Sequence, residues 1–143
     1  MTKIKDIIDE LEQFAPVSFQ ESWDNSGLLV GNRSEEISSV LLTVDVTESI
    51  IDEAISKKAN LIVAHHPIIF KGLKSLTGKN DIERSIIKAI KHDISIYVMH
   101  TNLDVMEEGV SFKMAEKLAL QNIKTLDISS SPLKKLVVFV PKP

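Results

Sequence analysis

The feature that most constrains the fold is a repeated alternation of short apolar segments with longer amphipathic ones. Apolar segments of strand length occupy residues 40–46, 61–64 and 94–99, and stretches with helical spacing of apolar residues separate them. Buried strands that alternate with helices are typical of right-handed βαβ units, because parallel neighbours need a long crossover connection. The sequence therefore predicts an α/β fold with a mostly parallel sheet flanked by helices.

The helical segments carry their own start and stop signals. Thr2 and Thr47 are placed to cap two helices, and Pro16 ends the first of them. We expect an apolar stripe of isoleucines on the helix over residues 81–91. We assign no structure to residues 28–31. The four predicted helices cover residues 2–14, the segment that follows Thr47, residues 81–91 and residues 110–120.

A length of 143 residues suits one main domain. Residues 129–132, Ser-Ser-Ser-Pro, indicate a boundary, and residues 137–140 predict a strand without an evident partner. We therefore expect an α/β domain over residues 1–131 and the start of a following or inserted domain over residues 132–143.

Composition excludes several classes of function. The 17 basic and 20 acidic residues give a net charge of -3, which disfavours a nucleic-acid-binding module. The chain has no cysteine, so disulfides and thiolate metal sites are excluded. The N-terminus lacks a signal-peptide pattern and no apolar stretch has the length of a membrane span, so we expect a cytoplasmic protein without membrane contact.

Imidazole and carboxylate side chains follow three of the predicted strands at their C-terminal ends. They are Asp45, the pair His65 and His66, and His100 followed by Asp104. Ligands of open α/β sheets bind beyond these strand ends. Without cysteine, His nitrogens and carboxylate oxygens must hold any metal ion, and such ligands suit Zn, Fe or Mn better than Ca or Mg. The pattern predicts a shared site.

The adjacent histidines need a break in strand geometry before they can serve one site. Neighbouring side chains of a regular strand point to opposite faces of the sheet. Pro67 ends regular pairing directly after them, so both rings can face one crevice. Each could then serve a different metal ion, with the carboxylate of Asp104 bridging the two ions.

Other interpretations of the polar residues stay open at this point. His92 ends a predicted helix, where a surface position is favoured by the helix dipole. Asp45 is interpreted first as a capping or turn residue. His100 either orients Asp104 or a substrate, or only forms hydrogen bonds at the strand end. For Trp23 we expect a buried indole that holds its loop in place.

Four segments, taken together and in order, resemble the NIF-three-like (YbgI-type) family, whose members are often called GTP cyclohydrolase I type 2 homologues. The resemblance extends from the first helix to about residue 128. The segments are Ser22-Trp-Asp-Asn-Ser-Gly-Leu-Leu-Val-Gly31, Val44-Asp-Val-Thr47, His65-His-Pro-Ile-Ile-Phe70 and His100-Thr-Asn-Leu-Asp104.

The resemblance implies the N-terminal half of a NIF-three-like fold, in which two α/β halves enclose two divalent metal ions. His65, His66 and Asp104 match the metal ligands of that half, and the family's remaining His and Glu ligands belong to a C-terminal half beyond residue 143. Asp45 and His100 would orient ligands or move protons. One departure, Glu108-Gly-Val-Ser111 in place of the family's Gly-Gly-Val-Asn, affects a polar position near the site.

The same resemblance implies a toroidal homohexamer and metal-dependent hydrolysis of a nucleotide-like substrate. The alternative is a metal-binding scaffold, or a regulatory assembly subunit, that catalyses no reaction. These two functions make different predictions about nucleotide turnover, and fold resemblance alone does not choose between them.

Overall fold

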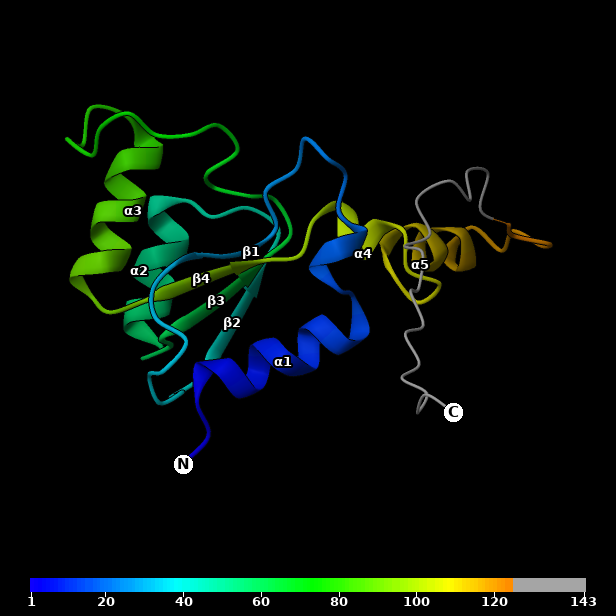
Figure 1. Cartoon of the computed structure of the whole chain (residues 1–143), viewed down its shortest axis with the longest axis horizontal. Helices are drawn as coiled ribbons and strands as arrows, with labels where there is room; N and C mark the ends of the chain where they lie inside the picture. Colours follow the sequence, from blue (N-terminus) through cyan, green and yellow to red (C-terminus); the bar gives the residue numbers. More distant parts are fainter. Residues whose placement is uncertain (125–143) are drawn as a thin grey trace, which may run out of the picture.

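The computed structural model of the protein describes residues 1–124 and has an α/β architecture (Figure 1). A four-stranded sheet has the order β1-β4-β3-β2, in which β2, β3 and β4 are parallel and β1 is antiparallel to β4. This arrangement confirms the predicted mostly parallel sheet. The strands are β1 (Gly27–Val30), β2 (Val40–Thr43), β3 (Leu61–Ala64) and β4 (Ser95–Val98).

The helices follow the strands in the order that βαβ units require. Two of them connect parallel strands: α2 links β2 to β3, and α3 links β3 to β4. No helix within residues 1–124 combines the length and the apolar character needed to cross a bilayer. The helices are α1 (Ile4–Phe14), the 3-10 turn Val17–Phe19, α2 (Glu48–Ser56), α3 (Asp81–Lys91), α4 (Thr101–Asp104) and α5 (Val110–Lys117).

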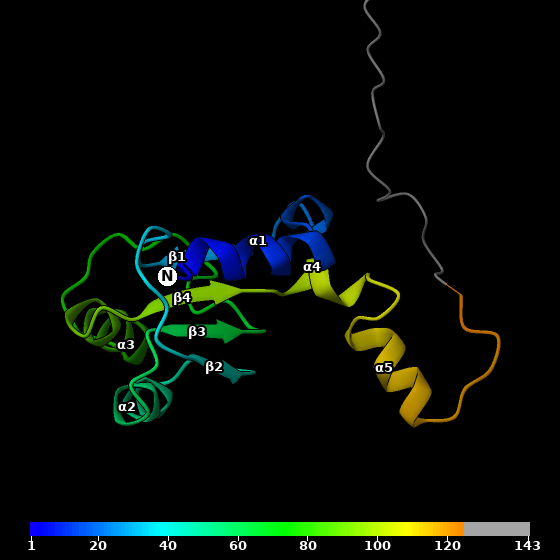
Figure 2. The same cartoon turned by 90° about the horizontal axis from the view of Figure 1, so that it is seen from below.

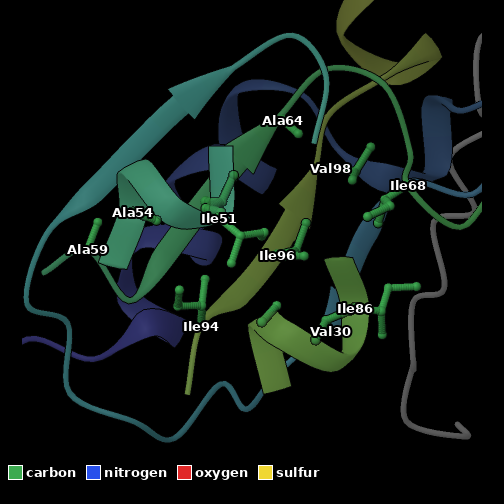
Figure 3. Packing of buried hydrophobic residues seen from close by; sticks show 12 residues of the cluster. Val30, Ile51, Ala54, Ala59, Ala64, Ile68, Ile86, Ile94, Ile96 and Val98 are labelled. Carbon is green, nitrogen blue, oxygen red and sulfur yellow. The ribbon is translucent and has the colours of Figure 1, made fainter. Parts of the chain in front are cut away.

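Strand β3 is buried on both faces because helices cover the sheet from both sides. Ile62 and Ala64 belong to one buried cluster with Ile51 of α2 and Ile86 of α3. Figure 3 shows Ala64, Ile51 and Ile86 of this cluster. The alternate residues of β3 pack against α1 on the opposite face. These two contacts explain why the strand is apolar throughout rather than alternating with polar residues.

The opposite face of the sheet is covered by α1. Ile4 and Ile8, one helical turn apart, pack with Leu61, Val63 and Tyr97. This confirms the first predicted helix. The helix begins at Ile4, and its N-cap is Lys3 rather than the predicted Thr2, because the backbone N–H of Lys3 donates to Oδ2 of Asp6 at 2.8 Å.

Strand β2 corrects one expectation. Residues 40–46 were expected to form a buried strand, but the strand ends at Thr43, and Leu42 is 75% exposed. β2 lies at an edge of the sheet, and Leu42 pairs with Val63 on the face that α1 covers. The α1 cluster includes Val63 but does not reach Leu42, which therefore stays in solvent.

Helix α3 has the predicted bounds, but its buried face differs from the predicted stripe of isoleucines. Ile86 is buried, whereas Ile82 is 45% and Ile90 is 54% exposed. The buried residues of this helix also include Glu83 and Ala89. The isoleucine pattern therefore identified the helix correctly and misplaced its interface.

Helix α5 ends at Lys117, three residues earlier than predicted, and it lies beyond the end of the sheet (Figures 1 and 2). Met114 is 60% exposed, and only Ala115 of this helix is buried. Residues 28–31, which had no sequence assignment, contribute most of β1. The predicted boundary at residues 129–132, the strand at 137–140 and the second unit at 132–143 lie outside the described residues.

The connection between β3 and α3 is held by one buried carboxylate. Oε2 of Glu83 accepts hydrogen bonds from the backbone N–H groups of Thr77, Gly78 and Lys79 at 2.9, 3.0 and 3.3 Å. The N–H of Thr77 is the main cause that lowers the pKa of Glu83 to about 2, while burial acts in the opposite direction. The charge of Glu83 therefore fixes the end of the loop that begins at the histidine pair.

We predict that Glu83→Gln destabilises the protein at neutral pH, because glutamine is a weaker acceptor for these backbone donors. The pKa of Glu83 falls from an ordinary 4.5 to about 2 on folding, so its ionised form stabilises the fold above pH 4.5. That stabilisation is lost as the pH falls from 4.5 toward 2. Urea unfolding of both proteins should therefore show a gap in midpoint at pH 7 that closes toward pH 2. The exposed Glu10→Gln is the control; a gap that is independent of pH would contradict the prediction.

Candidate metal centre

Three histidines meet beyond the C-terminal ends of the two central strands. His65 and His66 follow β3, and His100 follows β4. One ring nitrogen from each of the three lies within 4.8 Å of the others, a spacing at which they could hold a metal ion. The parallel register that places Ala64 beside Val98 brings these segments together.

The side chains of the adjacent pair turn toward one side, as predicted from the break in strand geometry at Pro67. The ring centroids of His65 and His66 are 5.0 Å apart, and His100 lies 5.3 and 5.7 Å from them. The backbone N–H groups of both residues still donate to carbonyl oxygens of the β2 side, Thr43 and Val44. Hydrogen bonding to the β2 side therefore continues for two residues beyond the end of β3, and the side chains of His65 and His66 converge there.

Each imidazole is held by a hydrogen bond from Nδ1 to a carbonyl or carboxylate oxygen. Such an oxygen accepts hydrogen bonds but cannot donate them. Nδ1 therefore donates this bond, which leaves Nε2 as the ring nitrogen available to a ligand. Oriented histidines of this kind are typical metal ligands. The three contacts are His65 to the carbonyl oxygen of Met99 at 2.9 Å, His66 to Oδ1 of Asp45 at 2.7 Å, and His100 to Oδ1 of Asp24 at 2.8 Å.

Asp104 lies at the edge of this group. Its Oδ1 is 3.7 Å from Nε2 of His65, and its side chain is 36% exposed. The short helix α4, which starts directly after His100, carries Asp104 to this position. The structure thus brings all the sequence-predicted site residues together beyond the C-terminal ends of the parallel strands, with His100 inside the three-histidine group.

Asp45 has a different role from the capping role that we considered first. Its carboxylate contacts the ring of His66, while Thr47 caps α2 by accepting from the N–H of Ile50 at 3.3 Å. The side chains of His66 and Asp45 are 50% and 66% exposed. This side of the group is open to solvent, whereas His65 and His100 are largely covered.

Asp24 belongs to the candidate site although the sequence does not predict it there. Its side chain is fully buried, and it accepts hydrogen bonds from His100 and from the hydroxyl and backbone N–H of Thr101. Burial alone would raise its pKa, but the bonds from His100 and Thr101 outweigh it and lower the pKa to about 2. A lone aspartate in a loop gives no sequence signal of such burial.

The same loop corrects the expectation for Trp23. The indole was expected to be buried and to hold the loop, but it is 58% exposed. The loop is held by polar contacts instead, because Asp24 binds His100 and Asn25 Nδ2 donates to the carbonyl oxygen of Ile69 at 2.6 Å. His92, at the end of α3, is exposed as expected.

We predict that Asp24→Asn lowers the free energy of unfolding by about 2 kcal/mol, because several buried donors lose an ionised acceptor. Urea unfolding at pH 7 measures this change. Asp93→Asn, at an exposed turn with φ 52°, where asparagine is well tolerated, is the matched control. Equal stability of the Asp24 variant and the parent protein would contradict the role assigned to this carboxylate.

Comparison with known proteins agrees with the fold. The model of the family Duf34/NIF3 (NGG1p interacting factor 3) matches residues 2–141. The proteins named GTP cyclohydrolase 1 type 2 homolog from Bacillus subtilis (strain 168) and Halalkalibacterium halodurans are 46% and 47% identical, over 95% and 94% of this chain. The chain spans 37% of the length of each relative.

A solved structure gives the same result. The crystal structure of Staphylococcus aureus protein SA1388 superposes with a TM-score of 0.83 and 44% sequence identity. The superposition covers 88% of this chain and 41% of that protein. Because the family match extends over nearly the whole sequence, the chain belongs to the Duf34/NIF3 (NGG1p interacting factor 3) family.

Proposed function

We propose that this protein binds divalent metal ions beyond the C-terminal ends of the central strands. The ligands are Nε2 of His65, His66 and His100 and the carboxylate of Asp104. The observation that carries the proposal is that all three imidazoles are fixed at Nδ1 by oxygen acceptors. A ring held in this way keeps its second nitrogen free and oriented. Three imidazoles and one carboxylate form a donor set that suits Zn, Fe or Mn.

The proposed centre holds two ions. Asp104 supports this number because its carboxylate, 3.7 Å from Nε2 of His65, lies beside the three-histidine group rather than within it. A carboxylate offers two oxygens, which allows it to bridge neighbouring ions.

We further propose that the centre serves a metal-dependent hydrolase that acts on a nucleotide-like substrate. When bound, a divalent ion supplies Lewis-acid chemistry and makes water a better nucleophile near neutral pH. The chain's own residues would orient this chemistry: Asp24 and Asp45 fix the rings of His100 and His66 through Nδ1. The relatives' name, GTP cyclohydrolase 1 type 2 homolog, supports a nucleotide as the substrate class.

Location and assembly complete the proposal. We propose a cytoplasmic protein that self-associates, in the toroidal hexamer that family resemblance suggests. The exposed apolar residues Leu42 and Val44, 75% and 57% exposed on the edge strand and just after it, support burial of this edge against further protein.

A second candidate is a metal-binding scaffold without catalytic turnover. The exposure of His66 and Asp45 favours it, because a site open to water on one side gives weaker electrostatic stabilisation of a transition state. The two candidates share the metal centre and differ only in whether a nucleotide is consumed.

We predict that the purified protein, loaded with Zn²⁺ or Mn²⁺ and desalted, retains metal in stoichiometric amount, and that His65→Ala/His66→Ala loses it. Elemental mass spectrometry measures the metal content. His92→Ala is the matched control, because it removes an exposed imidazole far from the group and should leave the metal content unchanged. Equal metal in the double variant and the parent would contradict the proposed site.

We predict that the metal-loaded protein consumes GTP and that Asp104→Ala reduces the rate at least about tenfold, because ligand orientation at a metal centre is lost. Product formation followed by chromatography measures the rate. Glu107→Ala removes an exposed carboxylate in the next turn of the chain and is the control. Equal rates for parent and Asp104 variant would exclude catalysis at this centre, and no turnover in either would favour the scaffold.

A further inference from the structure

Two exposed aromatic side chains lie together beside the three-histidine group. Trp23 is 58% and Phe70 is 48% exposed. Their ring centroids are 5.9 Å apart, with an angle of 61° between the planes. The indole of Trp23 also lies 6.3 Å from the ring of His100. The pair therefore adjoins the candidate metal centre on the side of His100.

These two residues come from separate loops that hydrogen bonds fix to each other. Asn25, two residues after Trp23, donates through Nδ2 to the carbonyl oxygen of Ile69, which directly precedes Phe70, at 2.6 Å. Asp24 ties the first loop to His100. The aromatic pair is thus held at a defined position by the same contacts that orient a ring of the metal centre.

The edge-to-face contact leaves much of both rings in solvent, since Trp23 is 58% and Phe70 is 48% exposed. Each ring therefore still offers area for stacking. Exposed aromatic side chains stack with planar rings, including all nucleobases, without specific hydrogen bonds. Nothing in the local contacts of Trp23 requires an indole for packing, because polar contacts already hold its loop.

We infer that Trp23 and Phe70 form a stacking platform for a planar heteroaromatic ring. The ring belongs to a small ligand whose oxygen donors reach the adjacent centre at His65, His66 and His100. This inference rests on the proposed function and deepens it, since it assigns the recognition of the base-like part of the substrate to two residues outside the metal-binding set. The ligand class is a nucleotide or another planar heterocycle that carries metal-binding oxygens.

Trp23 is the only tryptophan of the chain, so its fluorescence reports on the platform directly. The probe is GMP, titrated into metal-free and then Zn²⁺-loaded protein, with ribose 5-phosphate as the ligand that lacks a base. GMP should quench the emission in a saturable way, in both forms of the protein, and ribose 5-phosphate should not. This readout requires no catalytic activity.

Variants of Phe70 separate stacking from nonspecific quenching. Phe70→Leu should weaken GMP binding on the order of tenfold, as expected for the loss of one aromatic stacking partner, whereas Phe70→Tyr should retain it. Phe14→Leu, at a 40% exposed phenylalanine at the end of α1, is the matched control and should bind GMP as the parent does. Circular dichroism checks that each variant is folded.

Three results would overturn the platform: no response to GMP, equal GMP affinity of Phe70→Leu and the parent, or Trp23 emission that changes with protein concentration alone. The last result would assign the aromatic pair to contact with a second copy of the chain. Metal analysis of the same samples keeps the two proposals separate. Protein that binds GMP through Phe70 but holds no metal supports the platform and contradicts the proposed function. Protein that holds metal without responding to GMP contradicts the platform alone.

Discussion

The parallel pairing of β3 with its two neighbours is the interaction on which the rest of the structure depends. It aligns the strands so that Ala64 lies beside Val98, and the hydrogen bonds continue beyond the strand ends to His65, His66 and Met99. Because the parallel strands all end on the same side of the sheet, polar side chains that follow these ends meet there although they are distant in the sequence. The apolar clusters on both faces keep this alignment fixed, since every residue of β3 is buried.

A second level of order comes from carboxylates that act within the protein rather than on a ligand. Glu83 collects backbone N–H groups at the end of the loop that begins at His65, and Asp24 collects donors at the start of α4. Both carry a lowered pKa because their ionised forms receive several hydrogen bonds. Irregular segments therefore hold defined positions beside the sheet, and they carry His100 and the aromatic residues with them.

Much of this fold could be predicted from the sequence because periodicity reports directly on burial. The bounds of α3, the buried strand β3 and the cap at Thr47 were predicted correctly, and the polar residues at strand ends do meet. The errors arose where burial depends on which element covers a face. Leu42 and Ile82 are apolar but lie on faces that no described helix or strand covers fully, and a local pattern cannot reveal that. The environment of Asp24 depends on His100 and Thr101, which lie 76 and 77 positions later in the sequence. No motif within the loop of Asp24 could indicate these contacts.

The carbonyl oxygen that holds His65 belongs to the backbone of Met99, whereas His66 and His100 are held by side chains. A point mutation can replace Asp45 or Asp24, but none removes a backbone carbonyl. No substitution of its partner can therefore remove the hydrogen bond of His65, whereas substitution of Asp45 or Asp24 can remove the hydrogen bond of His66 or His100. Substitution of either carboxylate by an amide would alter the hydrogen bond that orients one imidazole, while the ring of His65 stays oriented. The orientation of His65 therefore does not depend on any one side chain, whereas the orientations of His66 and His100 each depend on a single carboxylate.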